Sequence, residues 1–246
     1  MYRYQILIEY DGKDYVGWQK QKNGKSIQSQ IQNCMSKILK EKIKLYGSGR
    51  TDSGVHAINQ SAHFDTKKII INLFKFLSSL NHFLNPKKIT IKKINKKKSS
   101  FHSRYSAKER EYKYIILNRN APSVLENYKV WHLKKKLDLN SMKKGAKKLV
   151  GTHNFNAFRS SNCDAKSPIK TIKKISITKK NEKITFTFRS KSFLKNQVRS
   201  MIGCLKYIGE KKWKVEDLEK VLNSKSRKFC APPAPAHGLF LSKVIY

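Results

Sequence analysis

Acidic residues are scarce in this chain of 246 residues, where 16 Asp and Glu stand against 54 Lys and Arg. The formal net charge is therefore +38, and so large an excess of one sign opposes compaction through self-repulsion. A polyanionic partner relieves that repulsion, and nucleic acid is the obvious candidate. Lys, Ile and Asn are frequent along the whole chain, however, so part of the lysine excess is equally explained as a solvated surface.

Cysteines are also few, and they are far apart in the chain: Cys34, Cys163, Cys204 and Cys230. No CxxC pair or Cys/His cluster exists, which argues against a zinc site, and a disulfide framework is not expected in a chain of this type. No run of about 18 apolar residues is present to span a membrane. The first residues lack the apolar core of a signal peptide. We therefore expect a cytoplasmic protein with no metal and no membrane partner.

The first part of the chain predicts a β-α-β-β-α-β order. Alternating apolar residues from Tyr4 to Tyr10 predict a strand, and apolar residues at helical spacing predict a helix over about 26–40 with Ser26 as its N-cap. Further strands are predicted at 43–48 and 60–66, a second helix at 72–84, and a closing strand at 89–94.

The second part of the chain repeats this order. The patterns predict strands at 109–117, 169–178, 184–188 and 238–246, and helices at 140–150, 193–208 and 215–222. Two such units in tandem indicate an α+β fold of two ferredoxin-like halves, each with an antiparallel sheet. We expect one half over 1–100, the other over 101–246, and an RNA-binding cleft between them.

One acid has an unusual context, which is Asp52 in the segment GSGRTDSGVHA over residues 47–57. The three glycines of this segment permit tight or positive-φ backbone and a close approach of a large ligand. A carboxylate held there can act as a nucleophile or as a general base. The structural alternative is an Asp that bonds only the backbone of its own turn.

The segment GRTDSGVHA (49–57) resembles the signature of the tRNA pseudouridine synthase A family, GRTDxGVHA, at every fixed position. Other blocks resemble the family in the same order along the whole chain, including IEYDGKDYVGWQKQ (8–21), FHSRYSAKEREYKYII (101–116), SFLKNQVRSMIG (192–203) and APPAPAHGLFLSKVIY (231–246). The chain departs from the family pattern at Asn154, Lys170 and Gln197, which puts individual RNA contacts in doubt but not the reaction.

The resemblance implies a fold, a reaction and roles for four residues. It implies the pseudouridine synthase fold and an isomerase that turns uridine into pseudouridine at positions 38, 39 and 40 of the tRNA anticodon stem-loop, without a cofactor. Asp52 matches the catalytic aspartate, and Arg199 matches the arginine of the FLxxMVR helix, where a cation would keep the carboxylate ionised. Tyr112 matches a tyrosine that stacks on the target base.

Arg50 is the fourth expected site residue. If its segment is a strand, Arg50 and Asp52 point to the same face, so Arg50 would enter the space that the flipped base leaves, or bind a phosphate. Each of the four residues also has a structural explanation. Asp52 would bond its own turn, Arg199 would be a surface residue, Arg50 would form a salt bridge, and Tyr112 would belong to the core. The family further implies a homodimer.

Two other functions compete with this one. A basic RNA-binding protein without catalysis explains the net charge equally well, but it does not explain a glycine-rich loop that presents an Asp beside an Arg. A metal-dependent nuclease requires clustered carboxylates, and the ten residues on either side of Asp52 hold no other acid.

Overall fold

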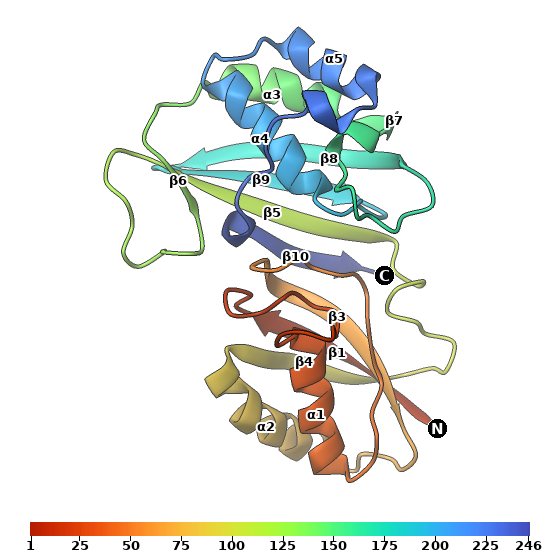
Figure 1. Ribbon diagram of the computed structural model, residues 1–246. Helices are drawn as coiled ribbons and strands as arrows, with labels where there is room; N and C mark the ends of the chain where they lie inside the picture. The colour runs from red at the N-terminus through yellow and green to blue at the C-terminus, as the bar shows by residue number, and fades with distance from the viewer. The chain divides into compact units, whose positions relative to one another are not determined.

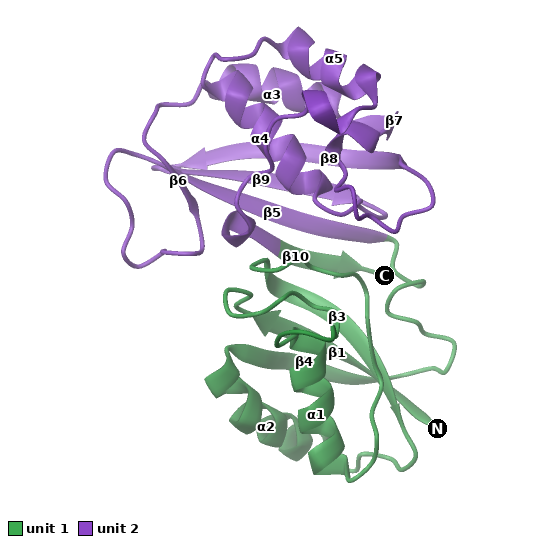
Figure 2. Cartoon of the chain, in the orientation of Figure 1, with its two compact units in different colours: residues 1–108, 241–246 green, residues 109–240 purple.

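The computed structural model describes all 246 residues, and the chain divides into two compact units (Figure 2). Unit 1 comprises residues 1–108 and 241–246, and unit 2 comprises 109–240. The predicted boundary after residue 100 is therefore eight residues early, and the assignment of the C-terminus to the second half is wrong for 241–246. The reason is that β10 (Leu239–Ile245) lies beside β3 (His56–Thr66), which joins the end of the chain to unit 1.

Unit 1 has the predicted β-α-β-β-α-β order. Its first elements are β1 (Tyr2–Tyr10), α1 (Ile27–Leu39) and β2 (Leu45–Gly47), and after β3 come α2 (Leu73–Leu84), a short 3-10 turn (Asn85–Lys87) and β4 (Ile89–Lys97). The strands run in the order β4-β1-β3, and β2 pairs with β3. The pairs that β1 makes with β3 and β4, and β2 with β3, are antiparallel.

One face of this sheet carries the core of unit 1. Tyr4, Ile6, Ile8 and Tyr10 alternate along β1 and are all buried, as the sequence predicts. Both helices lie on one side of the sheet (Figure 1) and bury the residues that face it, Ile27, Ile31 and Met35 from α1 and Phe76, Leu80 and Leu84 from α2. The predicted cap is confirmed, because Ser26 accepts a hydrogen bond from the Ser29 N–H at 3.2 Å.

The segment after β4 is attached to β3 through a buried histidine. His63 Nδ1 accepts the Ser103 N–H at 3.2 Å, and its ring stacks on Tyr46 at 5.0 Å between centroids. Burial, with the positive charges of His102 and Arg3 nearby, lowers the pKa of His63 to about 4. The imidazole is therefore neutral near neutral pH, which its role as acceptor requires.

Unit 2 has five complete strands, four of which pair in one antiparallel series, and helices against them. Its strands β5 (Glu109–Asn118), β9 (Lys183–Ser190), β8 (Ile169–Lys180) and β7 (Gly151–Asn154) pair antiparallel in that order. The helices α3 (Leu139–Lys148), α4 (Gln197–Gly209) and α5 (Val215–Ser224) lie on one side of it (Figure 1). In each unit the helices thus lie on one face of its strands, which confirms the α+β class.

Unit 2 differs from the predicted elements in two respects. The short strands β6 (Trp131–Leu133), which runs parallel to β5, and β7 were not predicted, because three or four residues contain too little alternation. Helix α4 begins at Gln197 and not at 193, because Asn196 takes a left-handed φ of 63°. The Gln197 side chain then accepts the Leu194 N–H at 2.8 Å, which closes the preceding loop. None of the helices has the length and apolar character needed to cross a bilayer.

Candidate active site

The loop that carries Asp52 connects β2 to β3, and buried hydrogen bonds fix its first half. The Ser48 N–H donates to the Ser61 carbonyl at 2.7 Å, and the Ser48 hydroxyl donates to Gln60 Oε1 at 2.7 Å. The amide of Gln60 in turn donates to the Gly49 carbonyl at 2.9 Å. Because Ser48 and Gln60 are both buried, these bonds do not exchange readily with water, and they hold the start of the loop against β3.

The backbone on both sides of the Asp52 carboxylate is also fixed. The Thr51 carbonyl accepts the Trp18 N–H at 3.1 Å, and the Thr51 hydroxyl is 2.8 Å from that of the buried Tyr10. The Val55 N–H donates to the Asp52 carbonyl at 3.1 Å, which closes a turn. Asp52 is half-buried in this turn. A carboxylate on so constrained a backbone has few positions open to it, which is the property that a nucleophile requires.

The loop over residues 11–18 lies in direct contact with this turn, and two glycines make the contact possible. A Cβ on Gly17 would lie 2.5 Å from the Thr51 carbonyl oxygen, and one on Gly12 would lie 2.1 Å from that of Val55. Gly17 also has a φ of +110°, which side-chain-bearing residues rarely adopt. The Asp52 turn is thus held between β3 and a loop from the start of the chain.

His56 connects the same two loops. The Gly12 N–H donates to His56 Nδ1 at 3.0 Å, and Asp11 Oδ1 lies 3.1 Å from the same nitrogen. The His56 side chain is buried. Its contacts are those of a structural hydrogen-bonding residue at the base of the loop.

Arg50 does not lie in a strand. Residues 48–55 are loop and turn between β2 and β3, so the argument that Arg50 and Asp52 face the same way because they are two residues apart in a strand is wrong. Arg50 is exposed. Its expected role at the flipped base stays a prediction.

Arg199 lies in unit 2, in the first turn of α4. Its Nε donates to the Ala234 carbonyl at 2.7 Å and its Nη1 donates to Asn196 Oδ1 at 3.1 Å, while the Ala234 N–H donates to the Arg199 carbonyl at 2.9 Å. The guanidinium is half-buried and oriented by both neighbours. This is an ordered cation and not a mobile surface side chain.

Tyr112 lies in unit 2 as well, on β5. Only 9% of the residue is exposed, and its ring meets Phe193 edge to face at 5.2 Å. Tyr114, two residues later, is fully buried and donates its hydroxyl to the Pro235 carbonyl at 2.9 Å. Burial raises the pKa of Tyr114, and the charge of Arg199 opposes that rise. Tyr112 is therefore packed as a core residue, and its stacking on a base stays a prediction.

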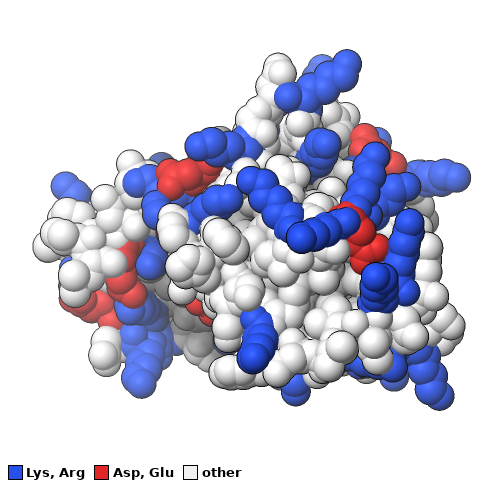
Figure 3. Space-filling model, turned by 90° about the horizontal axis from the view of Figure 1, so that it is seen from below, with Lys and Arg blue, Asp and Glu red and all other residues white.

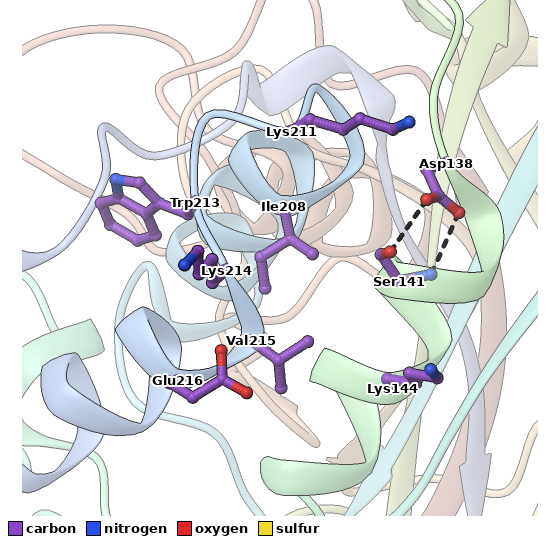
Figure 4. Close-up of a pocket in the computed structure, with 9 residues that line it drawn as sticks. All are labelled: Asp138, Ser141, Lys144, Ile208, Lys211, Trp213, Lys214, Val215 and Glu216. Atoms are coloured by element: carbon purple, nitrogen blue, oxygen red, sulfur yellow. Dashed lines mark hydrogen bonds between the residues drawn. The ribbon is translucent and has the colours of Figure 1, made fainter.

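The positive charge is widely distributed. Lys and Arg side chains are spread over the face shown in Figure 3, and Asp and Glu side chains are fewer. No group of three or more His, Cys, Asp or Glu side chains is arranged to hold a metal ion. The structure also contains a pocket of about 370 Å³ in unit 2, between α3 and the α4–α5 turn (Figure 4), but none of the four expected site residues lines it.

Comparison with known proteins identifies the family. A family model described as tRNA pseudouridine synthase matches residues 6–106 and 146–246. The chain belongs to the tRNA pseudouridine synthase family. The resemblance found in the sequence is thereby confirmed, and with it the class of enzyme, an isomerase. The first match contains the Asp52 turn and the second contains Arg199, whereas Tyr112 lies outside both.

Three relatives of this tRNA pseudouridine synthase family match over the whole chain, and each is named tRNA pseudouridine synthase A. The protein from Pelagibacter ubique (strain HTCC1062) is 59% identical, with 100% of both chains covered. The protein from Parvibaculum lavamentivorans is 41% identical, again with 100% of both covered. The protein from Maricaulis maris (strain MCS10) is 39% identical, over 100% of this chain and 98% of the relative.

Sequence reasoning missed the residues that hold the candidate site residues in place. Gly17, Gln60 and Ala234 act through backbone approach or buried hydrogen bonds, and none of them carries a reactive group. Gly12 and Gly17 lie in the block IEYDGKDYVGWQKQ (8–21), and these two glycines were the available sequence signal for the close contact with the Asp52 turn. Asp52 and Arg199 lie in different units, and their pairing stays a prediction.

Proposed function

We propose that this protein isomerises uridine to pseudouridine at positions 38, 39 and 40 of the tRNA anticodon stem-loop, with Asp52 as the nucleophile. The observation that carries the proposal is the half-buried carboxylate of Asp52 on a turn fixed by Trp18, Tyr10 and Val55, in a member of the tRNA pseudouridine synthase family. The target bases lie in or beside a stacked stem, so the reaction requires the uridine to be flipped out.

The reaction breaks the N1–C1′ bond of uridine and forms a C5–C1′ bond. The C5 proton leaves and N1 gains one, so the base gains and loses no other atoms and needs no oxidant. The protein must therefore supply a carboxylate, a charge that keeps it ionised, and a surface for the detached base. We assign these roles to Asp52, to Arg199 and to Tyr112, and we assign the vacated space in the stem to Arg50.

The test of the nucleophile compares Asp52→Asn with Asp14→Asn on an anticodon stem-loop transcript. Asp14 is a matched control because it is an exposed Asp in unit 1 that pairs only with the exposed Lys88, at 2.8 Å. Release of tritium from C5-labelled uridine reports turnover, and filter binding reports RNA affinity. We expect Asp52→Asn to bind RNA and release no tritium, whereas Asp14→Asn resembles the wild type. Retained turnover in Asp52→Asn excludes the nucleophile assignment, and a wild type that binds without turnover favours a binding protein.

The role of Arg199 requires a separate measurement. If its guanidinium keeps the Asp52 carboxylate ionised, replacing Arg199 with Gln moves the acid limb of the kcat/KM profile to higher pH. Arg199→Lys keeps the charge and should restore that limb, although its turnover stays lower because lysine cannot make the hydrogen bonds to Ala234 and Asn196 in the same geometry. A uniform fall in kcat/KM at all pH values would instead indicate a structural role.

We further propose that the enzyme acts in the cytoplasm as a homodimer, with one tRNA contacting both subunits. The net charge of +38 supports a polyanionic RNA partner, and it predicts that the affinity for RNA falls steeply as the salt concentration rises. Light scattering across a range of concentrations measures the oligomeric state directly. A monomer at concentrations where turnover is full would exclude the dimer as the active form.

A further inference from the structure

Two of the four cysteines come together within unit 2 although they are distant in sequence. Cys204 lies within α4 and Cys230 follows a short 3-10 turn (Arg227–Phe229), and their sulfur atoms are 3.5 Å apart. A disulfide bond is about 2.05 Å long, so a movement of roughly 1.5 Å would join them. Cys34 and Cys163 have no such neighbour, since their sulfur contacts are with the Leu80 carbonyl and the Lys195 N–H.

The surroundings of the pair give its two thiols different reactivity. Cys204 is fully buried, whereas Cys230 is partly exposed. The hydrogen bond from Cys204 lowers the pKa of Cys230, and the positive charge of Arg227 lowers it further. The same hydrogen bond and burial raise the pKa of Cys204. A partly exposed cysteine whose thiol has a lowered pKa, beside a second thiol, is the arrangement of a reactive cysteine with a resolving partner.

Arg227 is held where its charge acts on Cys230. Its Nη1 donates to the Ser200 hydroxyl at 2.9 Å and its Nη2 donates to the Ala231 carbonyl at 3.3 Å. One guanidinium thus connects α4 to the residue that follows Cys230. These two hydrogen bonds to the protein itself hold the Arg227 guanidinium in place without a ligand.

The segment over residues 230–234 packs along α4 as far as Arg199. Gly203 has no side chain, which admits the Pro232 carbonyl to a position where a Cβ would lie 2.0 Å from its oxygen. Ala234 then exchanges two hydrogen bonds with Arg199, at 2.7 and 2.9 Å. A bond between Cys204 and Cys230 would therefore link the same two segments that orient the Arg199 guanidinium.

We propose that Cys204 and Cys230 form a peroxide-sensitive site that closes reversibly to a disulfide and thereby lowers turnover through Arg199. The Cys230 thiolate attacks a peroxide oxygen, the O–O bond breaks, and a sulfenic acid and hydroxide form. The Cys204 thiol then attacks that sulfur, the disulfide forms, and water leaves. A dithiol reductant reverses the reaction. The effect on turnover rests on the proposed function, but formation of the disulfide does not.

The first experiment measures the disulfide itself on the full protein. After treatment with hydrogen peroxide we expect intact mass to fall by about 2 Da, the two hydrogens lost, and two titratable thiols to disappear. Cys230→Ser and Cys204→Ala should show no such loss, and Cys34→Ser should behave as the wild type. No fall in mass, or the same fall in Cys230→Ser, overturns the proposal. Because each of the two variants removes one thiol of the pair, the test still decides the proposal if one of them fails to fold.

The second experiment measures the consequence. We expect tritium release by the oxidised wild type to fall on the order of tenfold, because displacements near 1 Å can cost up to about a hundredfold, and to recover on reduction. Cys230→Ser should be insensitive to peroxide. A disulfide that forms without changing turnover overturns the link to Arg199. A wild type that is inactive when fully reduced refutes the proposed function instead, and the mass measurement still decides the disulfide.

Discussion

Gly17→Ala is the sharpest perturbation of the Asp52 turn that leaves every reactive group in place. The new Cβ would lie 2.5 Å from the Thr51 carbonyl oxygen and 3.1 Å from the carbonyl carbon of Asp52. Both atoms belong to backbone, which cannot rotate away as a side chain can. The Thr51 carbonyl also accepts the Trp18 N–H, so a movement of this oxygen weakens that bond as well.

The size of the effect follows from these distances. An ordinary contact is about 3.4 Å, so the Thr51 carbonyl must retreat by roughly 0.9 Å from its present 2.5 Å. Alanine at a φ of +110° adds backbone strain of about 1–3 kcal/mol. A displacement near 1 Å beside Asp52, the proposed nucleophile, lowers kcat by up to about a hundredfold. We therefore expect a modest loss of stability and a much larger loss of turnover.

Gly24→Ala is the matched control, because Gly24 has a similar φ of +98° but the atoms nearest to an added Cβ belong to the Val16 side chain and not to backbone. Urea denaturation measures the stability of both variants, and tritium release at saturating RNA with multiple turnovers measures their kcat. Both should lose similar stability, while only Gly17→Ala should lose about ten- to a hundredfold in kcat. Equal turnover in the two variants would refute the argument that this contact positions Asp52.

Three further predictions concern stability. The folded pKa of His63 is about 4, below its ordinary value of 6.5. The neutral imidazole therefore contributes fully to the free energy of unfolding above pH 6.5, and this contribution, at most about 3 kcal/mol, is lost as the pH falls from 6.5 to about 4. Urea titrations from pH 7 to 4 should show this fall, with a flatter profile for His63→Gln. Ser26→Ala removes the α1 cap and should cost about 1 kcal/mol in urea denaturation, and no change would contradict the role of the cap. Tyr114→Phe leaves the Pro235 carbonyl without its buried donor and should cost about 1–3 kcal/mol, whereas an unchanged midpoint would mean that water replaces the hydroxyl.

Local patterns were sufficient for the main helices and strands. Alternation along β1 and helical spacing along α1 identify the buried residues, because each side chain's direction follows from its place in the element. The same reasoning failed for β6 and β7, which are too short to show a period, and for the start of α4. That start is fixed by the left-handed backbone of Asn196 and by a side-chain bond of Gln197. Neither leaves a periodic signal.

The candidate residues Asp52 and Arg199 could be named from the sequence, whereas the residues that hold them in place could not. Asp52 and Arg199 became candidates because their motifs resemble those of a family. The family model now shows independently that the chain belongs to this family. The placement of Arg50 on a strand was wrong, since the pairing of β2 with β3 ends at Gly47 and residues 48–55 form loop and turn. The contacts that hold Asp52 come from Tyr10, Gly17 and Trp18, more than thirty residues earlier in the chain.

The sequence alone determined the α+β class, the alternation of buried and exposed faces, and the family to which the chain belongs. These depend on local periodicity and on short motifs, and both can be read one residue after another. Only the tertiary structure decided that Gly17 meets Thr51 and that Cys204 meets Cys230. Contacts of this kind depend on strand register and helix packing across long stretches of chain, and no local pattern specifies them. For the same reason the last six residues belong with unit 1, because the pairing of β10 beside β3 outweighs its position in the chain.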